Sequence, residues 1–170
     1  MAKKSAGLLM YRIRDGELEV LLVHPGGPHW VRKDAGAWFI PKGEVAPGED
    51  DAAAATREFT EETGLTPHGP FLLLGAVQHK SGKIVTAWAF EGDCDPATLT
   101  SNTFSMEWPP HSGKQREFPE IDRAAFFTVR AAEEKMHAAE FEFVSRLLGM
   151  RSATALGLPR RRGAPESKNR

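Results

Sequence analysis

The sequence predicts one α+β domain, an α/β/α sandwich with flanking helices on a mixed central sheet. Apolar runs follow the order strands, helix, strands, helix, without the regular alternation that is typical of a doubly wound parallel sheet. A chain of 170 residues, 41% of them hydrophobic, is long enough to bury a core of its own. Its single cysteine, Cys94, excludes an intrachain disulfide and gives no sign of an oxidising compartment. We place the domain at residues 1–150.

The first predicted elements are a β-hairpin and a short strand. Two aliphatic runs, residues 5–13 and 17–25, flank an Asp-Gly pair, which between such runs is a strong signal for a two-residue turn. A Gly- and Trp-rich loop follows. The short strand 38–41, "WFIP", comes next, and Pro41 ends it because proline has no N–H to donate to a ladder.

The strongest helix signal covers residues 51–63. Alanines supply helix propensity, Asp50 or Asp51 supplies an N-cap oxygen, and Gly64 supplies the left-handed residue that ends the helix. The helix therefore lies inside a stretch, residues 43–65, whose other feature is its density of carboxylates.

The second half of the chain predicts four further strands and one helix. Residues 71–79 and 83–92 form a second hairpin around "KSG", and residues 103–108 and 123–129 are later strands. Residues 130–148 repeat apolar side chains near helical spacing, so a second helix closes the domain.

Charge is unevenly distributed along the chain. The net charge is −1, but residues 159–170 hold five Lys or Arg and one Glu, a local +4 that leaves the remainder at −5. We read residues 151–170 as a basic, disordered tail, with weak attraction to nucleic acid as the alternative. The acidic body argues against an extended nucleic-acid surface, and no apolar run reaches membrane-helix length. We expect a soluble cytoplasmic monomer or homodimer, with no membrane partner.

Three glutamates crowd one face of the predicted helix. Glu58, Glu61 and Glu62 stand at positions i, i+3 and i+4, so their carboxylates project side by side and repel one another. Oxygen ligands at this density suit hard divalent cations such as Mg²⁺ or Mn²⁺. The alternative is an acidic solvent face. Arg57, which can pair with Glu61 or Glu49, and the Gly-rich turn before the helix favour a built metal site.

Residues 43–65 match every fixed position of the motif G-x5-E-x7-R-E-U-x-E-E-x-G-U, in which U is a bulky aliphatic or aromatic residue. The matching residues are Gly43, Glu49, Arg57, Glu58, Phe59, Glu61, Glu62, Gly64 and Leu65. The sequence therefore resembles the Nudix family, and the order of strands and helices around the motif is similar to a Nudix fold over residues 5–148.

The resemblance implies a pyrophosphohydrolase that attacks a nucleoside diphosphate linked to another moiety, X, with Mg²⁺ or Mn²⁺ as its cofactor. It implies that Glu58, Glu61 and Glu62 hold the metal, with the carbonyl of Gly43 or Lys42 as a further ligand. The bound cation would neutralise diphosphate oxygens and lower the pKa of a bound water.

The remaining catalytic roles are also implied by the resemblance. Arg57 with Glu49 would orient the metal-binding carboxylates. The general base would be Glu58, or Glu120 in "FPEIDRAAFF", whose place before a late strand resembles an acidic position in many relatives. A plain surface acid is the alternative for Glu120.

The segment "AWFIPKGE" resembles the "W-x-x-P-K-G-H" segment of dinucleoside polyphosphate and (d)NTP hydrolases, with Lys42 placed to meet a phosphate. Glu44 departs from that pattern, because it replaces the histidine. We favour dinucleoside polyphosphates or (d)NTPs as substrates. The alternatives are an ADP-sugar, an RNA 5′ end, or a Nudix-fold module that senses nucleotide or RNA without hydrolysis.

Two tryptophans outside the expected core are candidates for binding a nucleobase by stacking. Trp30 lies in a loop with Arg32, and Trp108 precedes a segment that contains Lys114, so each ring has a cation nearby for phosphate. The alternative is that both rings cover sheet edges. The Pro-, Ser- and charge-rich segment 101–120 indicates a long loop over the site that carries specificity.

Overall fold

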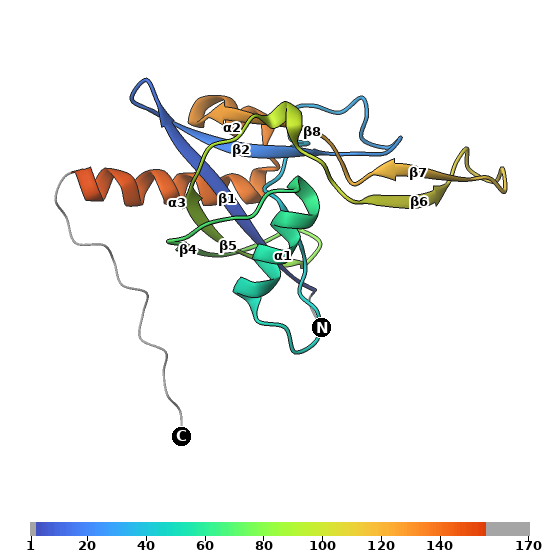
Figure 1. The fold of residues 1–170 in the computed structure, drawn as a ribbon, viewed down its shortest axis with the longest axis horizontal. Coiled ribbons are helices and arrows are strands. Elements are labelled where there is room, and N and C mark those ends of the chain that lie inside the picture. The colour runs from blue at the N-terminus through green and yellow to red at the C-terminus, as the bar shows by residue number, and fades with distance from the viewer. Residues whose placement is uncertain (1–2, 156–170) are drawn as a thin grey trace.

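The computed structural model describes residues 3–155 and contains a mixed sheet between helices (Figure 1). The strand order is β4-β5-β1-β2-β8, and β3 pairs with β1. The strands are β1 (Lys4–Arg14), β2 (Glu17–Pro25), β3 (Lys42–Glu44), β4 (Leu72–Gln78), β5 (Ile84–Glu91) and β8 (Ile121–Thr128). The sheet is mixed because β1 runs parallel to β5 and antiparallel to β2 and β3. This confirms the predicted fold class.

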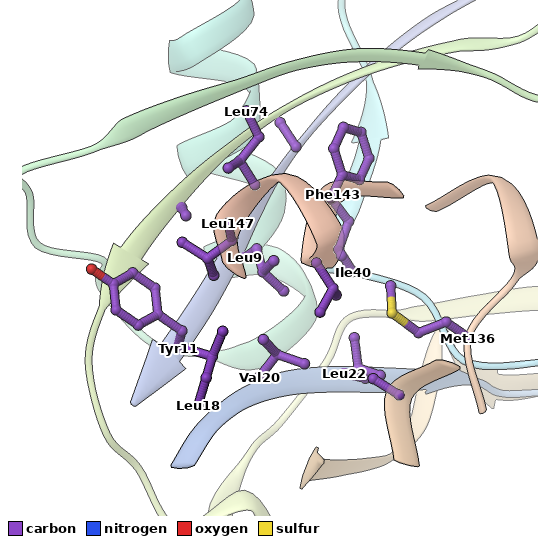
Figure 2. Close-up of a cluster of buried hydrophobic side chains, with 14 of the residues drawn as sticks. Leu9, Tyr11, Leu18, Val20, Leu22, Ile40, Leu74, Met136, Phe143 and Leu147 are labelled. Carbon is purple, nitrogen blue, oxygen red and sulfur yellow. The ribbon is translucent and has the colours of Figure 1, made fainter. Parts of the chain in front are cut away.

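Both faces of the sheet are buried, which makes the domain a three-layer sandwich. Along β1, Leu8 and Met10 pack in one cluster with Phe59 of α1 (Asp51–Thr63). Leu9 packs in the other cluster with Phe143 of α3 (Ala138–Ala155), as Figure 2 shows. Successive residues of a strand point to opposite faces, so one continuous apolar run supplies both cores.

The predicted hairpins and the predicted first helix are confirmed. Asp15 and Gly16 both have positive φ, 51° and 78°, as a two-residue turn between twisted strands requires. The second hairpin joins β4 and β5 in antiparallel register. Asp50 is the N-cap of α1, and its side chain accepts a hydrogen bond from the Ala53 N–H at 3.0 Å.

The short strand predicted over 38–41 is wrong. Phe39 makes only an isolated bridge to Val23, and β3 begins at Lys42, after Pro41 rather than before it. Pro41 has no N–H, but its carbonyl accepts a hydrogen bond from the Leu8 N–H at 3.1 Å. That bond guides the following residues into register beside β1.

The single closing helix predicted over 130–148 is also wrong. The structure has two helices, α2 (Val129–Lys135) and α3, separated by an extended Met136. Trp38 causes the break, because its N–H donates to the Lys135 carbonyl at 3.0 Å and its carbonyl accepts from the His137 N–H at 2.9 Å. These backbone groups therefore pair with Trp38 instead of continuing the helix.

The segment 101–120 is a β-hairpin rather than the predicted long loop. Its strands are β6 (Thr103–Glu107) and β7 (Gln115–Pro119), and they project from the main sheet as a separate arm (Figure 1). Phe104 and Phe118 face each other across this pair, with ring centroids 5.9 Å apart. A short 3-10 helix, η1 (Pro96–Thr98), precedes the arm.

Helix α3 ends at Ala155, so residues 151–155 of the expected tail are its last turn. The rest of that tail lies outside the described residues. Between residues 3 and 155, no helix combines the length and apolarity that crossing a membrane would require.

Candidate active site

Helix α1 is fixed at both ends and along one face, which sets the direction of its glutamates. Gly64 ends it with φ 76°, and the Gly64 N–H donates to the Thr60 carbonyl at 2.8 Å. Ala54, Ala55 and Phe59 are fully buried against the sheet. The glutamates at 58, 61 and 62 are only partly buried.

Arg57 binds the loop before α1 to the helix itself. Its guanidinium makes a two-point ion pair with Glu49, with Nε and Nη2 each donating at 2.9 Å. Nη1 donates to Glu58 at 2.8 Å and to Glu61 at 3.3 Å, and Nη2 also donates to the Glu44 carbonyl at 3.1 Å. Both pairings that the sequence suggested for Arg57 therefore occur.

The Arg57 side chain and the Ala46 N–H lower the pKa of Glu49 to about 2.

Gly43 and Glu58 are packed against each other. A Cβ atom on Gly43 would overlap the Glu58 carboxylate, so only glycine leaves room for it. Burial raises the pKa of Glu58, and the charges of Glu61 and Glu120 raise it further against the opposing effect of Arg57. The Gly43 carbonyl stays a predicted metal ligand.

Glu62 is the most strongly perturbed carboxylate of the motif. Its Oε2 accepts a hydrogen bond from the Lys42 N–H at 3.1 Å. Burial raises the pKa of Glu62 to about 8, and the charges of Glu58 and Glu120 contribute in the same direction. At pH 7 this pKa favours the protonated form of Glu62, and a cation bound nearby would favour the ionised form instead.

The structure brings Glu120 to the motif glutamates from a remote part of the chain. It follows β7, and its N–H donates to the Asn102 carbonyl at 2.9 Å, which anchors the base of the projecting arm. Its charge acts on both Glu58 and Glu62. Among the described residues its own carboxylate has no hydrogen-bond or ion-pair partner.

The donor set fits a hard divalent cation, although the carboxylates do not converge as a finished cage. Across residues 3–155, no three His, Cys, Asp or Glu side chains are already placed to hold a metal. Arg57 binds oxygens of Glu58 and Glu61 in this arrangement. Burial raises the pKa of both Glu58 and Glu62, and Gly43 leaves room for the Glu58 carboxylate, so oxygen ligands are held close together in a partly buried place.

Two lysines lie next to this acidic group. Lys42 extends its ammonium over the Phe39 ring, 4.2 Å from the centroid, and to Glu140 Oε2 at 3.2 Å. Lys83 is partly buried, and burial followed by the charge of Lys42 lowers its pKa. The charge of Lys42 lowers the pKa of Glu62, and the charge of Glu62 raises the pKa of Lys83.

Sequence reasoning missed Lys83, His79 and Glu140. No motif marks them, and they meet only through the fold. The one available signal was a glutamate placed among the apolar positions of the closing helix, where a charged residue requires a partner.

The two predicted stacking rings each pack edge-on against another aromatic ring. Trp30 packs edge-on against Phe39 with ring centroids 5.9 Å apart, and Trp108 packs edge-on against His29 at 5.5 Å. The arm and the loop containing Trp30 are therefore in contact. Arg32 and Lys114 are exposed, and their contact with substrate stays a prediction.

A cavity of about 440 Å³ opens beside Glu62. Its lining includes Leu99 after η1 and Asp122, Arg123 and Ala124 of β8. A group held there would lie between the acidic site and the edge of the sheet.

Comparison with known proteins agrees with this geometry. The NUDIX domain model matches residues 3–147, and the chain belongs to this family. The asymmetrical bis(5′-nucleosyl)-tetraphosphatase of Caenorhabditis elegans is 43% identical over 68 residues, 39% of this chain and 44% of that protein. The Rattus norvegicus protein of the same name is 33% identical over 104 residues, 54% of this chain and 66% of that protein.

The matches to these curated relatives thus span less than two thirds of their length. The fold comparison extends further. A crystal structure of a C. elegans Ap4A hydrolase binary complex covers 92% of this chain and 100% of its own, with 24% identity and a TM-score of 0.61. At this identity the likeness shows the fold.

Proposed function

We propose that this chain is a metal-dependent pyrophosphohydrolase of nucleoside diphosphates linked to a moiety X, acting first on dinucleoside polyphosphates and second on (d)NTPs. The main support for the proposal is that a group of carboxylates and two lysines lie at one site. Glu58, Glu62 and Glu120 act on one another electrostatically, and the charges of Lys42 and Lys83 act at the edge of the same group. A polyphosphate with a divalent cation complements both groups.

The metal would be Mg²⁺ or Mn²⁺, held by Glu58, Glu61 and Glu62 with the Gly43 carbonyl. When bound, such an ion neutralises diphosphate oxygens and lowers the pKa of a bound water. Arg57 orients Glu58 and Glu61 through its hydrogen bonds, and Glu49 holds Arg57 in place. Positioning of this kind is what distinguishes a catalytic carboxylate from one that is only nearby.

Of the two candidate bases, we assign proton removal from the attacking water to Glu120. Glu58 is engaged by Arg57 at 2.8 Å, whereas no side chain among the described residues pairs with Glu120. The effect of its charge on Glu58 and Glu62 supports this assignment. Glu120→Gln should therefore lower kcat while leaving KM nearly constant.

The preference for dinucleoside polyphosphates is supported by the names of the two curated relatives and by two local features. The cavity beside Glu62 offers space for one part of X, and the pair of loops bearing Trp30 and Trp108 offers aromatic surface for a base. A substrate with two nucleosides could occupy the cavity with one nucleoside and the aromatic surface with the other.

The test is a panel of dinucleoside polyphosphates, nucleoside triphosphates, ADP-sugars and 5′-triphosphorylated RNA, assayed in Mg²⁺ and in Mn²⁺. Wild-type protein should turn over dinucleoside polyphosphates fastest. Turnover of ADP-ribose alone would reject the substrate proposal and keep the chemistry. Binding of nucleotides without metal-dependent turnover would replace the hydrolase with a sensor.

A further inference from the structure

Behind the acidic site lies a group of titratable side chains, which we call the interior charge cluster. Its members come from four places in the fold: β3, the two ends of the β4-β5 connection, and the first turn of α3 with the residue before it. They are Lys42, His79, Lys83, His137 and Glu140. Glu140 is the single acid among them.

Glu140 is fully buried, with no exposed surface. Its Oε1 accepts a hydrogen bond from the Ile40 N–H at 3.2 Å. Its Oε2 lies 3.2 Å from Lys42 Nζ and 3.0 Å from His79 Nε2. The Lys42 ammonium and the Glu140 carboxylate attract at this distance, but Glu140 Oε2 and His79 Nε2 have no hydrogen bond with any described residue.

The break between α2 and α3 is what places Glu140 under the sheet. Because Met136 is extended, α3 begins anew at Ala138, and the Glu140 N–H donates to the His137 carbonyl at 3.0 Å. A carboxylate in the first turn of a helix is favoured by the unpaired N–H groups there. The local structure thus directs one acid into an otherwise apolar layer.

A buried acid of this kind does not stabilise a fold as well as an apolar side chain of the same size. Burial alone would raise the pKa of Glu140, but Lys42 and His79 outweigh burial and lower it, so the carboxylate is charged. Two buried polar atoms without hydrogen bonds add to the cost. Groups retained at such a cost are concentrated at functional sites.

We propose that Glu140 is a positioning residue that holds the Lys42 ammonium over Phe39, at the border of the acidic site, where it meets the substrate polyphosphate. This inference rests on the proposed function. The charge of Lys42 already lowers the pKa of Lys83, and the charge of Glu140 opposes that effect, so without Glu140 the two cations would repel each other uncompensated. Lys42 would then leave the position from which it acts.

The first test is Glu140→Gln in the full chain. Glutamine keeps the shape and the oxygen that accepts from Ile40, and removes only the charge. For diadenosine tetraphosphate, we expect KM to rise about 10-fold, which is the scale of losing one charged hydrogen bond between Lys42 and a phosphate. We expect kcat to change less than about 3-fold. Glu140→Asp, which keeps the charge, should recover part of the KM increase.

The matched control is Glu142→Gln on the same helix. Glu142 is exposed and pairs with Arg146 one turn away, so its loss should leave KM and kcat unchanged. An unchanged KM in Glu140→Gln would overturn the proposal. So would equal changes in the Glu140 and Glu142 variants.

A double-mutant cycle tests whether Glu140 acts through Lys42. In a Lys42→Met background, Glu140→Gln should add nothing further to KM. A full additional increase would show that Glu140 acts independently, which contradicts the proposal. If Glu140→Gln does not fold, the pair Lys42→Met with Glu140→Met removes both charges and should match Lys42→Met alone, and a different KM would again contradict it.

Binding of inorganic tripolyphosphate separates this inference from the proposed function. If wild-type protein hydrolyses no nucleotide, the proposed function fails, but calorimetry with tripolyphosphate still compares wild type with Glu140→Gln. A dissociation constant about 10-fold weaker in the variant supports the positioning role. Equal dissociation constants overturn it.

Discussion

The guanidinium of Arg57 and the carboxylate of Glu49 form a two-point ion pair, with both N–O distances 2.9 Å. The remaining guanidinium nitrogen reaches Glu58 and Glu61. One side chain therefore connects the loop that precedes α1 with two of the glutamates proposed to hold metal. Two-point geometry of this kind is specific to arginine.

Arg57→Lys keeps the charge and loses this geometry. We expect kcat to fall about 10- to 100-fold, the usual effect of losing a group that orients metal ligands. KM should change little, because the substrate-facing lysines are untouched. Steady-state kinetics with Arg130→Lys, an exposed arginine of α2, provides the control. Equal kcat in Arg57→Lys and wild type would exclude an orienting role.

The same ion pair predicts how stability responds to acid. The pKa of Glu49 is about 2 in the folded protein, lowered from 4.5 first by Arg57 and then by the Ala46 N–H. A lowered pKa means that the folded state binds fewer protons than the unfolded state between these two values. The contribution of Glu49 is thus present above pH 4.5 and is lost as the pH falls through about 2.

Glu49→Gln should therefore make the acid-induced loss of unfolding free energy shallower between pH 4.5 and about 2. Urea unfolding at a series of pH values measures this slope. Glu17→Gln, at an exposed position in β2, is the comparison. Identical slopes for Glu49→Gln and wild type would mean that the ion pair does not form in solution.

Gly43→Ala tests the close contact with Glu58. The added methyl group would overlap the carboxylate, so Glu58 must move and we expect kcat to fall about 10- to 100-fold, as misplacement of a catalytic group produces. Gly149→Ala is the matched control, because a Cβ there meets no atom within 4 Å. Full activity in Gly43→Ala would show that Glu58 has no fixed position.

Trp30→Ala tests the aromatic surface proposed for a base. If a base stacks on this ring, KM for diadenosine tetraphosphate should rise at least about 5-fold, since a stacked base contributes about 1 to 3 kcal/mol. The dissociation constant of inorganic tripolyphosphate should not change. Equal losses for both compounds would indicate a structural role at the sheet edge. The same two measurements on Trp108→Ala test whether a base also stacks on the second ring.

The parts of the fold that depend on neighbours in sequence could be predicted. The Asp-Gly turn, the Asp50 cap and the Gly64 stop are local choices of backbone conformation. The break at Met136 could not, because it depends on hydrogen bonds to Trp38, almost 100 residues earlier in the chain. Periodicity shows that a segment is helical without showing where another part of the chain will interrupt it.

The site follows the same division. Spacing along one helix was enough to place Glu58, Glu61 and Arg57 together, and the pairing with Glu49 followed from the motif. Glu140 contacts Lys42 only because α3 packs beneath the sheet, and neither residue type nor spacing predicts that this particular pair forms. Glu120 was identified only by resemblance, and the structure places its charge beside Glu58 and Glu62.

Product analysis of diadenosine tetraphosphate incubated with Mg²⁺ and either wild-type protein or Glu62→Gln tests the proposed hydrolase most directly. We expect metal-dependent cleavage of the polyphosphate to two mononucleotides by wild type, and a loss of at least about 100-fold in Glu62→Gln. Absence of turnover in wild type with nucleotide binding intact, or full activity in Glu62→Gln, would contradict it.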